Sequence, residues 1–245
     1  MEHSFEKLET QYGTFYLLHC GKLTDDEYDK IKPIVEHLGG HWREKYNGFV
    51  FRKNVSDIFP YLLKTGVRIT EQYSFKEKTQ FYPTPKNVAK RVVELADIKD
   101  GMRVLEPSAG VGNIVDQILI NCDITCVEPY TPNSKILKQK GYRTIETIFE
   151  DFAKDCGTFD RIVMNPPFSG QRDALHVMLA YSLLRNGGVL SAIVSENSLY
   201  YKTDTSDIFR NFFKTTNAKV EAVPPNAFEE SGTTIDTVIL QIKKI

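Results

Sequence analysis

The sequence predicts an α/β protein built on a mostly parallel sheet and preceded by a small α+β part. From residue 102 onward, short apolar runs alternate with longer amphipathic segments, as in repeated strand–helix–strand units. The runs MRVLE, DITCVE, RIVMN and VLSAIV lack polar alternation, which is typical of strands covered on both faces. The last two runs, KVEAVPP and TVILQIKKI, predict an antiparallel pair that ends the sheet.

Helical spacing of apolar residues fills the intervals between these runs. It is found in VGNIVDQILI, TPNSKILKQKG and RDALHVMLAYSLL. Gly141, and the pair Gly187 and Gly188, follow such segments, and we expect them to end helices.

The N-terminal part of the chain follows a different pattern. TFYLLH predicts a strand, residues 24–38 a helix capped by Thr24, and VSDIFPYLLKTG a short helix that closes on Gly66. Asn47 and Gly48 lie between two alternating runs, which indicates a β-hairpin. Residues 73–85 are charged and contain prolines, so they form the expected junction. We therefore divide the chain into domains at 1–78 and 79–245.

The composition excludes several classes of protein. With 41% hydrophobic and 26% charged residues over 245 positions, it is that of an ordinary globular chain. The apolar runs are far shorter than the roughly 20 residues that span a bilayer, and the N-terminus lacks the features of a secretory signal, so we expect a cytoplasmic protein. The net charge of −1 means that nucleic-acid binding needs a local basic patch. Free thiols are expected at Cys20, Cys122, Cys126 and Cys156, which form no CxxC pair.

The first candidate site follows the run MRVLE. Residues 107–113 place Gly110 and Gly112 at a strand-to-helix turn, where backbone amides can approach a ligand closely. Alone, this pattern is equally typical of a tight connection without a ligand. The next predicted strand ends in Glu128, about twenty residues after the glycines, where doubly wound folds hold a ribose. Together the two features predict one ligand-binding crevice.

The second candidate site is the run of Asn165, Pro166, Pro167 and Phe168 at the end of another predicted strand. Prolines fix the backbone and donate no hydrogen bond, so the Asn165 side-chain oxygen and a proline carbonyl can serve as adjacent acceptors. Two acceptors aimed at one point suit an exocyclic amine, and Phe168 offers a stacking face for the ring that carries it. The structural alternative is a rigid exit turn.

In this order, EPSAGVGN, CVEP, EDF and NPPF resemble the class I S-adenosylmethionine-dependent methyltransferases that methylate amines. FYPTP, upstream of the glycine turn, is similar to the corresponding motif of γ-type adenine-N6 DNA methyltransferases. The resemblance covers about residues 79–245 and implies a Rossmann-like class I methyltransferase fold, with a seven-stranded, mostly parallel sheet and an antiparallel last strand. It also implies methyl transfer from S-adenosyl-L-methionine to N6 of adenine in double-stranded DNA, with the base flipped out of the duplex.

The resemblance further implies which residues bind the cofactor. Its methionine part would lie along Tyr82, Thr84 and Pro85. Its amino acid and sulfonium would be surrounded by Glu106, Ala109, Gly110 and Gly112. Glu128 would hold the ribose hydroxyls, Asp151 would accept from the adenine amine and Phe152 would pack on that ring. Further contacts would come from Asn113, Pro129 and Asn165.

Three of these positions have structural alternatives. Phe152 is also typical of a core aromatic residue and Asp151 of a loop cap. Thr84 is also suited to be the N-cap of a helix that starts near Pro85.

The catalytic residues implied by the resemblance are Asn165, Pro166, Pro167 and Phe168. The target amine would donate to Asn165 Oδ1 and the Pro166 carbonyl, and no strong base is needed, because the amine becomes acidic only as the new bond forms. Phe168 and Phe228 would clamp the flipped base, although Phe228 is equally suited to a structural or cofactor-side role. No metal site is expected, since His37 and His41 are separated by two glycines.

Two segments are candidates for DNA contact. The hairpin offers Arg43, Lys45, Arg52 and Lys53, interleaved with Trp42, Tyr46, Phe49 and Phe51. Its structural alternative, favoured for Trp42 and Phe51, is that the aromatics pack on the neighbouring helix. The other segment offers Tyr200, Tyr201, Lys202, Arg210 and Lys214, and a helix with buried phenylalanines explains it equally well.

The sequence ends right after the last predicted strand, so we expect no large C-terminal recognition domain. Specificity would then come from residues 1–78 or a protein partner, or it would be low, which favours an orphan or phage-type enzyme. The alternatives are an RNA base-amine or protein glutamine-N5 methyltransferase, and a non-catalytic nucleic-acid-binding module with the same fold. A dinucleotide oxidoreductase is disfavoured, because EPSAGVGN lacks the third glycine of G-x-G-x-x-G.

Overall fold

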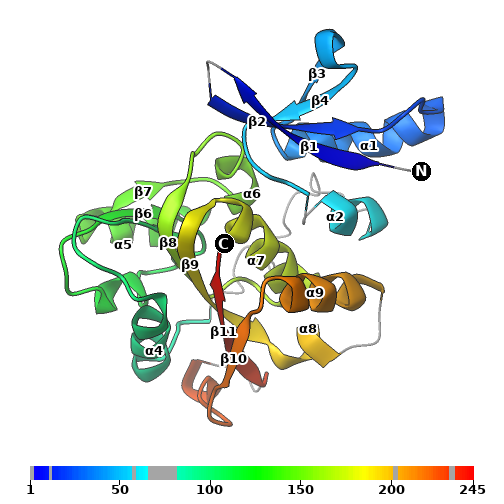
Figure 1. Cartoon of the computed structure of the whole chain (residues 1–245). Coiled ribbons are helices and arrows are strands. Elements are labelled where there is room, and N and C mark those ends of the chain that lie inside the picture. The colour runs from blue at the N-terminus through cyan, green and yellow to red at the C-terminus, as the bar shows by residue number, and fades with distance from the viewer. Residues whose placement is uncertain (1–2, 11–12, 57–58, 66–81, 201–203, 232–234) are drawn as a thin grey trace.

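The computed structural model describes residues 3–10, 13–56, 59–65, 82–200, 204–231 and 235–245. Its larger part is a seven-stranded sheet in the order β10-β11-β9-β8-β5-β6-β7 (Figure 1). Only β11 runs antiparallel to its neighbours in this sheet. The predicted mostly parallel sheet with an antiparallel last strand is therefore confirmed. Its strands are β5 (Arg103–Glu106), β6 (Asp123–Val127), β7 (Arg143–Ile145), β8 (Phe159–Met164), β9 (Leu184–Ser195), β10 (Lys219–Ala222) and β11 (Thr237–Lys243).

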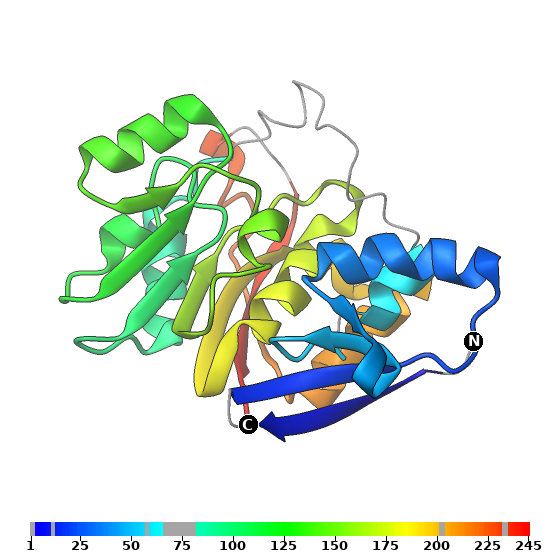
Figure 2. The same cartoon turned by 90° about the horizontal axis from the view of Figure 1, so that it is seen from above.

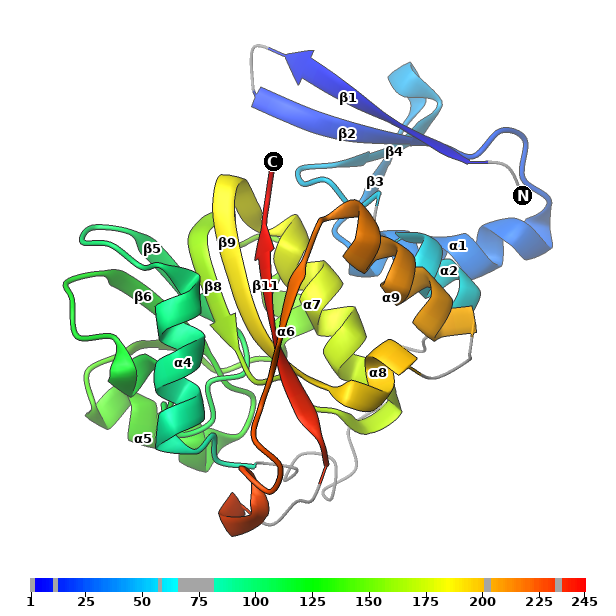
Figure 3. The same cartoon turned by 60° about the horizontal axis from the view of Figure 1, so that its bottom comes forward.

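Helices cover both faces of this sheet, as the continuous apolar runs predict. Successive residues of a strand point to opposite faces. Accordingly, Ile162 and Met164 of β8 belong to the core cluster on the α7 side, and Val163 belongs to the cluster on the α4 side. Figure 3 shows α4 and α7 on either side of β8 and β9. The helices of this part are α4 (Lys86–Ala96), α5 (Thr131–Gln139), α6 (Phe149–Phe152), α7 (Arg172–Ser182), α8 (Glu196–Tyr200) and α9 (Asp204–Thr215).

Two sequence predictions in this part are wrong. VGNIVDQILI forms only the 3₁₀ turn η2 (Val115–Gln117), because the chain becomes extended at Ile118 before β6 begins. Its apolar spacing reflects the burial of Ile114 and Val115 rather than a helix. Gly187 and Gly188 lie inside β9 and end no helix, since α7 already ends at Ser182. Gly141 does follow the end of α5, and its N–H donates to the Lys138 carbonyl.

The N-terminal part is a four-stranded antiparallel sheet in the order β1-β2-β4-β3. Thr24 caps α1 as predicted, within a capping box that it shares with Glu27. The predicted hairpin joins β3 to β4, but it turns through η1, and Asn47 follows at φ 45°. β1 has no counterpart among the sequence predictions, and Gly66 lies outside the described residues. The elements are β1 (Ser4–Thr10), β2 (Gly13–His19), α1 (Asp25–His37), β3 (His41–Arg43), η1 (Glu44–Tyr46), β4 (Gly48–Phe51) and α2 (Phe59–Thr65).

The two sheets share one hydrophobic core cluster. Phe51 and Phe59 from the N-terminal part belong to the same cluster as Phe159 and Leu184 from the larger part. Figures 2 and 3 both show the N-terminal sheet near the C-terminus of the chain, while η4 (Glu229–Ser231) lies at the other end of β11. Because β11 is antiparallel, its C-terminal end marks the edge at which the parallel strands begin. The division at residues 78 and 79 stays a prediction, because both positions lie outside the described ranges. None of the described helices is both long and apolar enough to cross a membrane.

Candidate functional site

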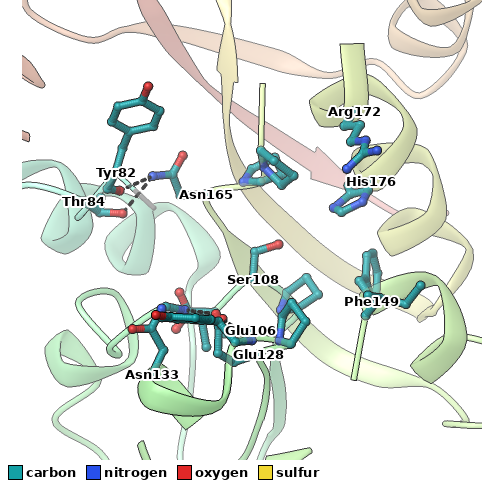
Figure 4. A pocket seen from close by; sticks show the side chains of 18 of the residues that line it. Tyr82, Thr84, Glu106, Ser108, Glu128, Asn133, Phe149, Asn165, Arg172 and His176 are labelled. Carbon is teal, nitrogen blue, oxygen red and sulfur yellow. Dashed lines mark hydrogen bonds between the residues drawn. The ribbon is translucent and has the colours of Figure 1, made fainter. Parts of the chain in front are cut away.

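A cavity of about 470 Å³ lies where β5, β6 and β8 end (Figure 4). Parallel strands that end together leave a crevice, which is where doubly wound folds bind ligands. Most of the residues predicted for cofactor and catalysis line this one cavity. They are Tyr82, Thr84, Glu106, Ala109, Gly110, Asn113, Glu128, Pro129, Asn165, Pro166, Pro167 and Phe168.

The glycine turn forms the floor between β5 and β6. Gly110 and Gly112 have φ values of 55° and 94°, a region that residues with a side chain rarely adopt. A Cβ on Gly112 would also lie 3.0 Å from Leu137 Cδ2. The turn is closed by a 2.8 Å hydrogen bond from Gly112 N to the Ala109 carbonyl. Gly112 itself is not among the residues that line the cavity, so its part is to shape the turn.

Two buried carboxylates lie on either side of this turn, Glu106 as the last residue of β5 and Glu128 directly after β6. Glu106 Oε2 accepts from Val115 N at 3.2 Å, and Glu128 Oε2 accepts from Gly110 N at 2.8 Å. Burial raises the pKa of Glu106 well above its usual range, and the nearby carboxylates of Asp116 and Glu128 add to the effect. Burial also raises the pKa of Glu128, although hydrogen bonds from the backbone of Tyr130 and Gly110 oppose the shift. The cavity floor therefore favours a ligand group that is positively charged or donates hydrogen bonds.

The Asn165 side chain has one bonded end and one end without a protein partner. Its Nδ2 donates to Thr84 Oγ1 at 3.0 Å and reaches the Tyr82 carbonyl at 3.5 Å, as the dashed lines in Figure 4 mark. Its Oδ1 is buried and has no hydrogen-bond partner among the described residues. A buried acceptor without a partner costs free energy, so it marks a place where a donor from a ligand belongs.

Thr84 is not a helix cap, which had been its structural alternative. The N-cap position of α4 is Pro85, and no side chain caps the helix there. Thr84 is instead buried, and its hydroxyl accepts from Asn165. Its carbonyl accepts from Asn113 Nδ2 at 2.9 Å, so Thr84 lies between the glycine-turn segment and the NPPF segment. Of the FYPTP motif, Phe81 lies outside the described residues.

The predictions for Asp151 and Phe152 are not supported by the structure. Asp151 is exposed and pairs with Lys154, with 2.7 Å between Oδ1 and Nζ. Phe152 packs against Phe159 in the main core, as its structural alternative expects. Neither lines the cavity. The reason is the one-turn helix α6, in which consecutive side chains diverge by about 100°, so that Phe149 and Glu150 face the cavity.

Phe149 and Glu150 form one wall of the cavity together with His176 of α7. His176 Nε2 lies 3.2 Å from Glu150 Oε1, and both side chains are 5% exposed. The His176 ring meets Phe149 edge to face at 5.3 Å. No motif in the sequence predicts that these residues lie in the site. Glu150 adjoins the predicted Asp151, but His176 has no motif, and only its helical spacing toward the core could have indicated it.

The two predicted base clamps have different environments. Phe168 follows the two prolines and lines the cavity. Phe228 is only 2% exposed and belongs to the hydrophobic cluster on the α4 side. It does not line the cavity. In this arrangement Phe228 has the structural role that was its alternative.

The predicted DNA contacts of the hairpin do not lie at the cavity either. Arg43, Lys45 and Arg52 are exposed on the N-terminal sheet. Lys53 does not fit the predicted DNA contact. Its Nζ donates to the Ala153 carbonyl, and burial lowers its pKa to about 8. Phe51 is buried in the core as its alternative expects, whereas Trp42 remains 45% exposed.

The second predicted DNA-contact set contains an amphipathic helix. α9 buries Phe209 and Phe212, as the structural alternative expects, and Arg210 donates to the Leu199 carbonyl. Tyr200 and Lys214 are exposed. Tyr201 and Lys202 lie outside the described residues.

No protein-family model matches the sequence, and no curated protein matches it. Solved structures do match. A type I restriction-modification methyltransferase subunit from Streptococcus thermophilus superposes with a TM-score of 0.58 at 17% identity, over 76% of this chain and 48% of that one. A Vibrio vulnificus protein assigned as the modification subunit of a type I restriction enzyme gives 0.54 at 16%, over 78% and 48%. A Listeria monocytogenes protein assigned to the class I S-adenosylmethionine-dependent methyltransferases gives 0.53 at 13%, over 77% and 67%.

At these identities the likeness establishes the fold, and the chain has the class I methyltransferase fold. It spans about half the length of the two restriction-modification subunits that it matches.

Proposed function

We propose that this protein transfers a methyl group from S-adenosyl-L-methionine to the N6 amine of adenine in DNA. The observation that carries the proposal is the buried Asn165 Oδ1, which has no partner among the described residues although it lies in the wall of the cavity. An amide oxygen only accepts hydrogen bonds, so its ligand must donate one. An exocyclic amine does this and keeps a second hydrogen for the neighbouring Pro166 carbonyl.

Methylation of an adenine amine needs two positioned hydrogen-bond acceptors more than it needs a base. The lone pair of an adenine amine is delocalised into the ring, and hydrogen bonds to two acceptors favour the pyramidal, nucleophilic form. S-adenosylmethionine, when bound, supplies a methyl group activated by the sulfonium. Asn165 and Pro166 would hold the amine toward that methyl. As the nitrogen–carbon bond forms, the methyl–sulfur bond would break to leave a neutral thioether, and the nitrogen would release a proton to solvent. Phe168 gives the extruded base a stacking face.

The rest of the cavity fits the cofactor. The backbone approach at Gly110 and Gly112 leaves room for its amino acid end, and the buried Glu106 favours a positive charge there. Each oxygen of Glu128 accepts one backbone N–H, and Asn133 adds a side-chain hydrogen bond, so three of the roughly four lone-pair sites are used and one remains for a ribose hydroxyl. Phe149 forms the wall on the side away from Asn165 and Tyr82, where the purine ring of the cofactor would pack (Figure 4). Glu150 also lines the cavity.

DNA is the favoured substrate for two reasons. FYPTP and the motif order resemble γ-type adenine-N6 DNA methyltransferases. In addition, two of the similar folds are type I restriction-modification subunits. We extend the proposal to an orphan or phage-type enzyme whose sequence specificity is low or comes from a protein partner. Arg43, Lys45 and Arg52 stay candidates for phosphate contacts outside the cavity, because they are exposed.

The test is to incubate the purified protein with radiolabelled S-adenosylmethionine and one acceptor at a time. The acceptors are unmethylated duplex DNA, structured RNA and a release factor, each followed by nucleoside or amino acid analysis. N6-methyladenine in DNA supports the proposal. Label in RNA or protein alone overturns the substrate but keeps the amine chemistry. Binding of the cofactor with no label in any acceptor would indicate a missing partner or a non-catalytic module.

A further inference from the structure

The segment from Tyr82 to Pro85 is held from three directions by side chains of the larger part. Ser231 Oγ donates to the Pro83 carbonyl at 2.6 Å. Asn113 Nδ2 donates to the Thr84 carbonyl at 2.9 Å, and Asn165 Nδ2 donates to the Thr84 hydroxyl at 3.0 Å. These donors come from η4, from the segment after the glycine turn and from the NPPF segment. Thr84 lies at the centre of this network.

The amide of Asn165 can face in either of two directions, and shape alone does not choose between them. A half-turn about the last side-chain bond exchanges the oxygen and the nitrogen, which are nearly equal in size. Hydrogen-bond partners therefore decide the orientation. The Tyr82 carbonyl can only accept, so it favours Nδ2 on its side, but it is 3.5 Å away. The Thr84 hydroxyl is closer, and it supplies the stronger of the two contacts. A hydroxyl can accept from Nδ2 or donate to Oδ1, so the Tyr82 carbonyl selects the orientation and the Thr84 hydroxyl then holds it.

Thr84 is suited to hold this amide because it is itself fixed. Its side chain is only 6% exposed, and a β-branched side chain has few rotamers. Asn113 fixes its backbone through the carbonyl. With Nδ2 held on this side by the Tyr82 carbonyl and the Thr84 hydroxyl, Oδ1 lies on the other side, where it has no partner among the described residues.

We infer that Thr84, supported by Asn113, is a positioning residue that holds the Asn165 amide in the orientation selected by the Tyr82 carbonyl, with Oδ1 facing the acceptor amine. This inference rests on the proposed function of Asn165. The FYPTP motif would then have a second role besides lining the cofactor cavity. Its threonine, Thr84, is hydrogen-bonded both to Asn113 of the glycine-turn segment and to Asn165.

The kinetic test compares Thr84→Val, Thr84→Ser and Thr216→Val. Valine keeps the shape of threonine and removes the hydroxyl, whereas serine keeps the hydroxyl. Thr216 is a matched control, because it is also buried, and its hydroxyl donates to the Phe212 carbonyl, outside the cavity residues. We expect Thr84→Val to lower kcat by about 10- to 100-fold, with the KM for S-adenosylmethionine within about threefold. Thr84→Ser should recover most of kcat, and Thr216→Val should leave it unchanged.

A second readout does not depend on activity. In protein labelled with ¹⁵N-asparagine, the side-chain amide signals of Asn165 can be assigned by their loss in Asn165→Ala. Thr84→Val should shift these signals, and Thr84→Ser should return them toward their positions in the unmodified protein. This holds even if the protein methylates none of the acceptors, so a failure of the proposed function is distinguishable from a failure of this inference.

Three results would overturn the inference. One is an unchanged kcat in Thr84→Val. Another is an equal loss of kcat in Thr84→Ser and Thr84→Val, because it would mean that shape and not the hydroxyl matters. The last is an Asn165 amide signal that does not move when Thr84 is changed to valine.

Discussion

Glu106 ends β5 and Glu128 directly follows the neighbouring parallel strand β6, and each carboxylate accepts a backbone N–H from the segment that connects those strands. Their burial places two acids in the floor of one cavity. The loss of solvent on burial, together with repulsion by the carboxylates of Asp116 and Glu128, favours protonation of Glu106 while no cation is bound. A cationic ligand would reverse this preference.

Replacing Glu106 by glutamine should therefore separate stability from binding. The pKa of a carboxyl group that is raised on folding makes the native chain hold more protons than the unfolded chain. Stability is then highest below the unfolded pKa and falls as pH rises toward the folded pKa. Glu106→Gln should remove this fall and raise the Tm without cofactor at pH 8 by roughly 2–4 °C, equivalent to about 1 kcal/mol. It should weaken S-adenosylmethionine binding about 10-fold.

Calorimetric titration and thermal unfolding at pH 5 and pH 8 check both halves of this prediction. In the unmodified protein, cofactor affinity should rise with pH as Glu106 loses its proton. Unaltered affinity in Glu106→Gln would show that this carboxylate does not meet the cofactor's positive charge.

Gly112→Ala should destabilise the glycine turn. At φ 94° the new methyl group is strained, and it lies 3.0 Å from Leu137 Cδ2. Gly101→Ala is the matched control, because Gly101 has φ 76° but no atom within 4 Å of the new methyl. We expect Gly112→Ala to cost about 1–3 kcal/mol in urea unfolding, more than Gly101→Ala, and only Gly112→Ala to weaken cofactor binding. Equal effects of the two would contradict a role of the Leu137 contact.

Glu150→Gln and Asp151→Asn test which of the two acidic residues contacts the cofactor. The structure places Glu150 in the cavity wall, whereas the EDF motif predicts a contact from Asp151. Glu150 lies in the cavity wall beside His176, whereas Asp151 is exposed and paired with Lys154. Cofactor affinity should fall about 10-fold in Glu150→Gln and stay within twofold in Asp151→Asn. The reverse order, measured by calorimetry, would mean that α6 turns its other face to the cofactor.

Lys53→Met should change the pH dependence of stability. Burial lowers the pKa of Lys53 from 10.5 to about 8. Between these values the unfolded chain binds more protons than the native chain, so stability gains a rising contribution with pH. Urea unfolding at pH 7.5 and pH 10 should show that Lys53→Met lacks this contribution, while the exposed Lys45→Met keeps it. An identical slope in Lys53→Met and the unmodified protein would contradict the burial of its ammonium group.

The sequence was most informative where burial dictates residue type. The central strands β5, β6, β8 and β9 are largely apolar runs because both their faces are covered, so the sequence alone predicts them. The short edge strand β7 has no counterpart among the predicted runs. β1 was missed because its SFEKLET pattern mixes charged and apolar residues, as an edge strand does. The helix predicted for VGNIVDQILI is wrong, because its apolar residues Ile114 and Val115 are buried at the start of a 3₁₀ turn and not along one face of a helix.

The same limit applies to the site. Most motif residues reached the cavity because they follow strands that end at one edge of the sheet. A helix of one turn is too short for its apolar spacing to show which side faces the cavity. The EDF motif therefore predicts Asp151 at the cavity, where the structure has Glu150. His176 depends on how α7 packs against α6, and Thr84 on hydrogen bonds from Asn113 and Asn165, all of which need the tertiary structure.

The most direct test of the central role of Asn165 is a paired measurement on Asn165→Ala. Calorimetry measures its S-adenosylmethionine affinity, and radiolabel transfer measures its turnover on the acceptor that the unmodified protein methylates. We predict an affinity within about twofold and a turnover lowered at least about 100-fold, because Oδ1 acts on the acceptor amine and not on the cofactor. Turnover equal to that of the unmodified protein would contradict the proposed role of Asn165.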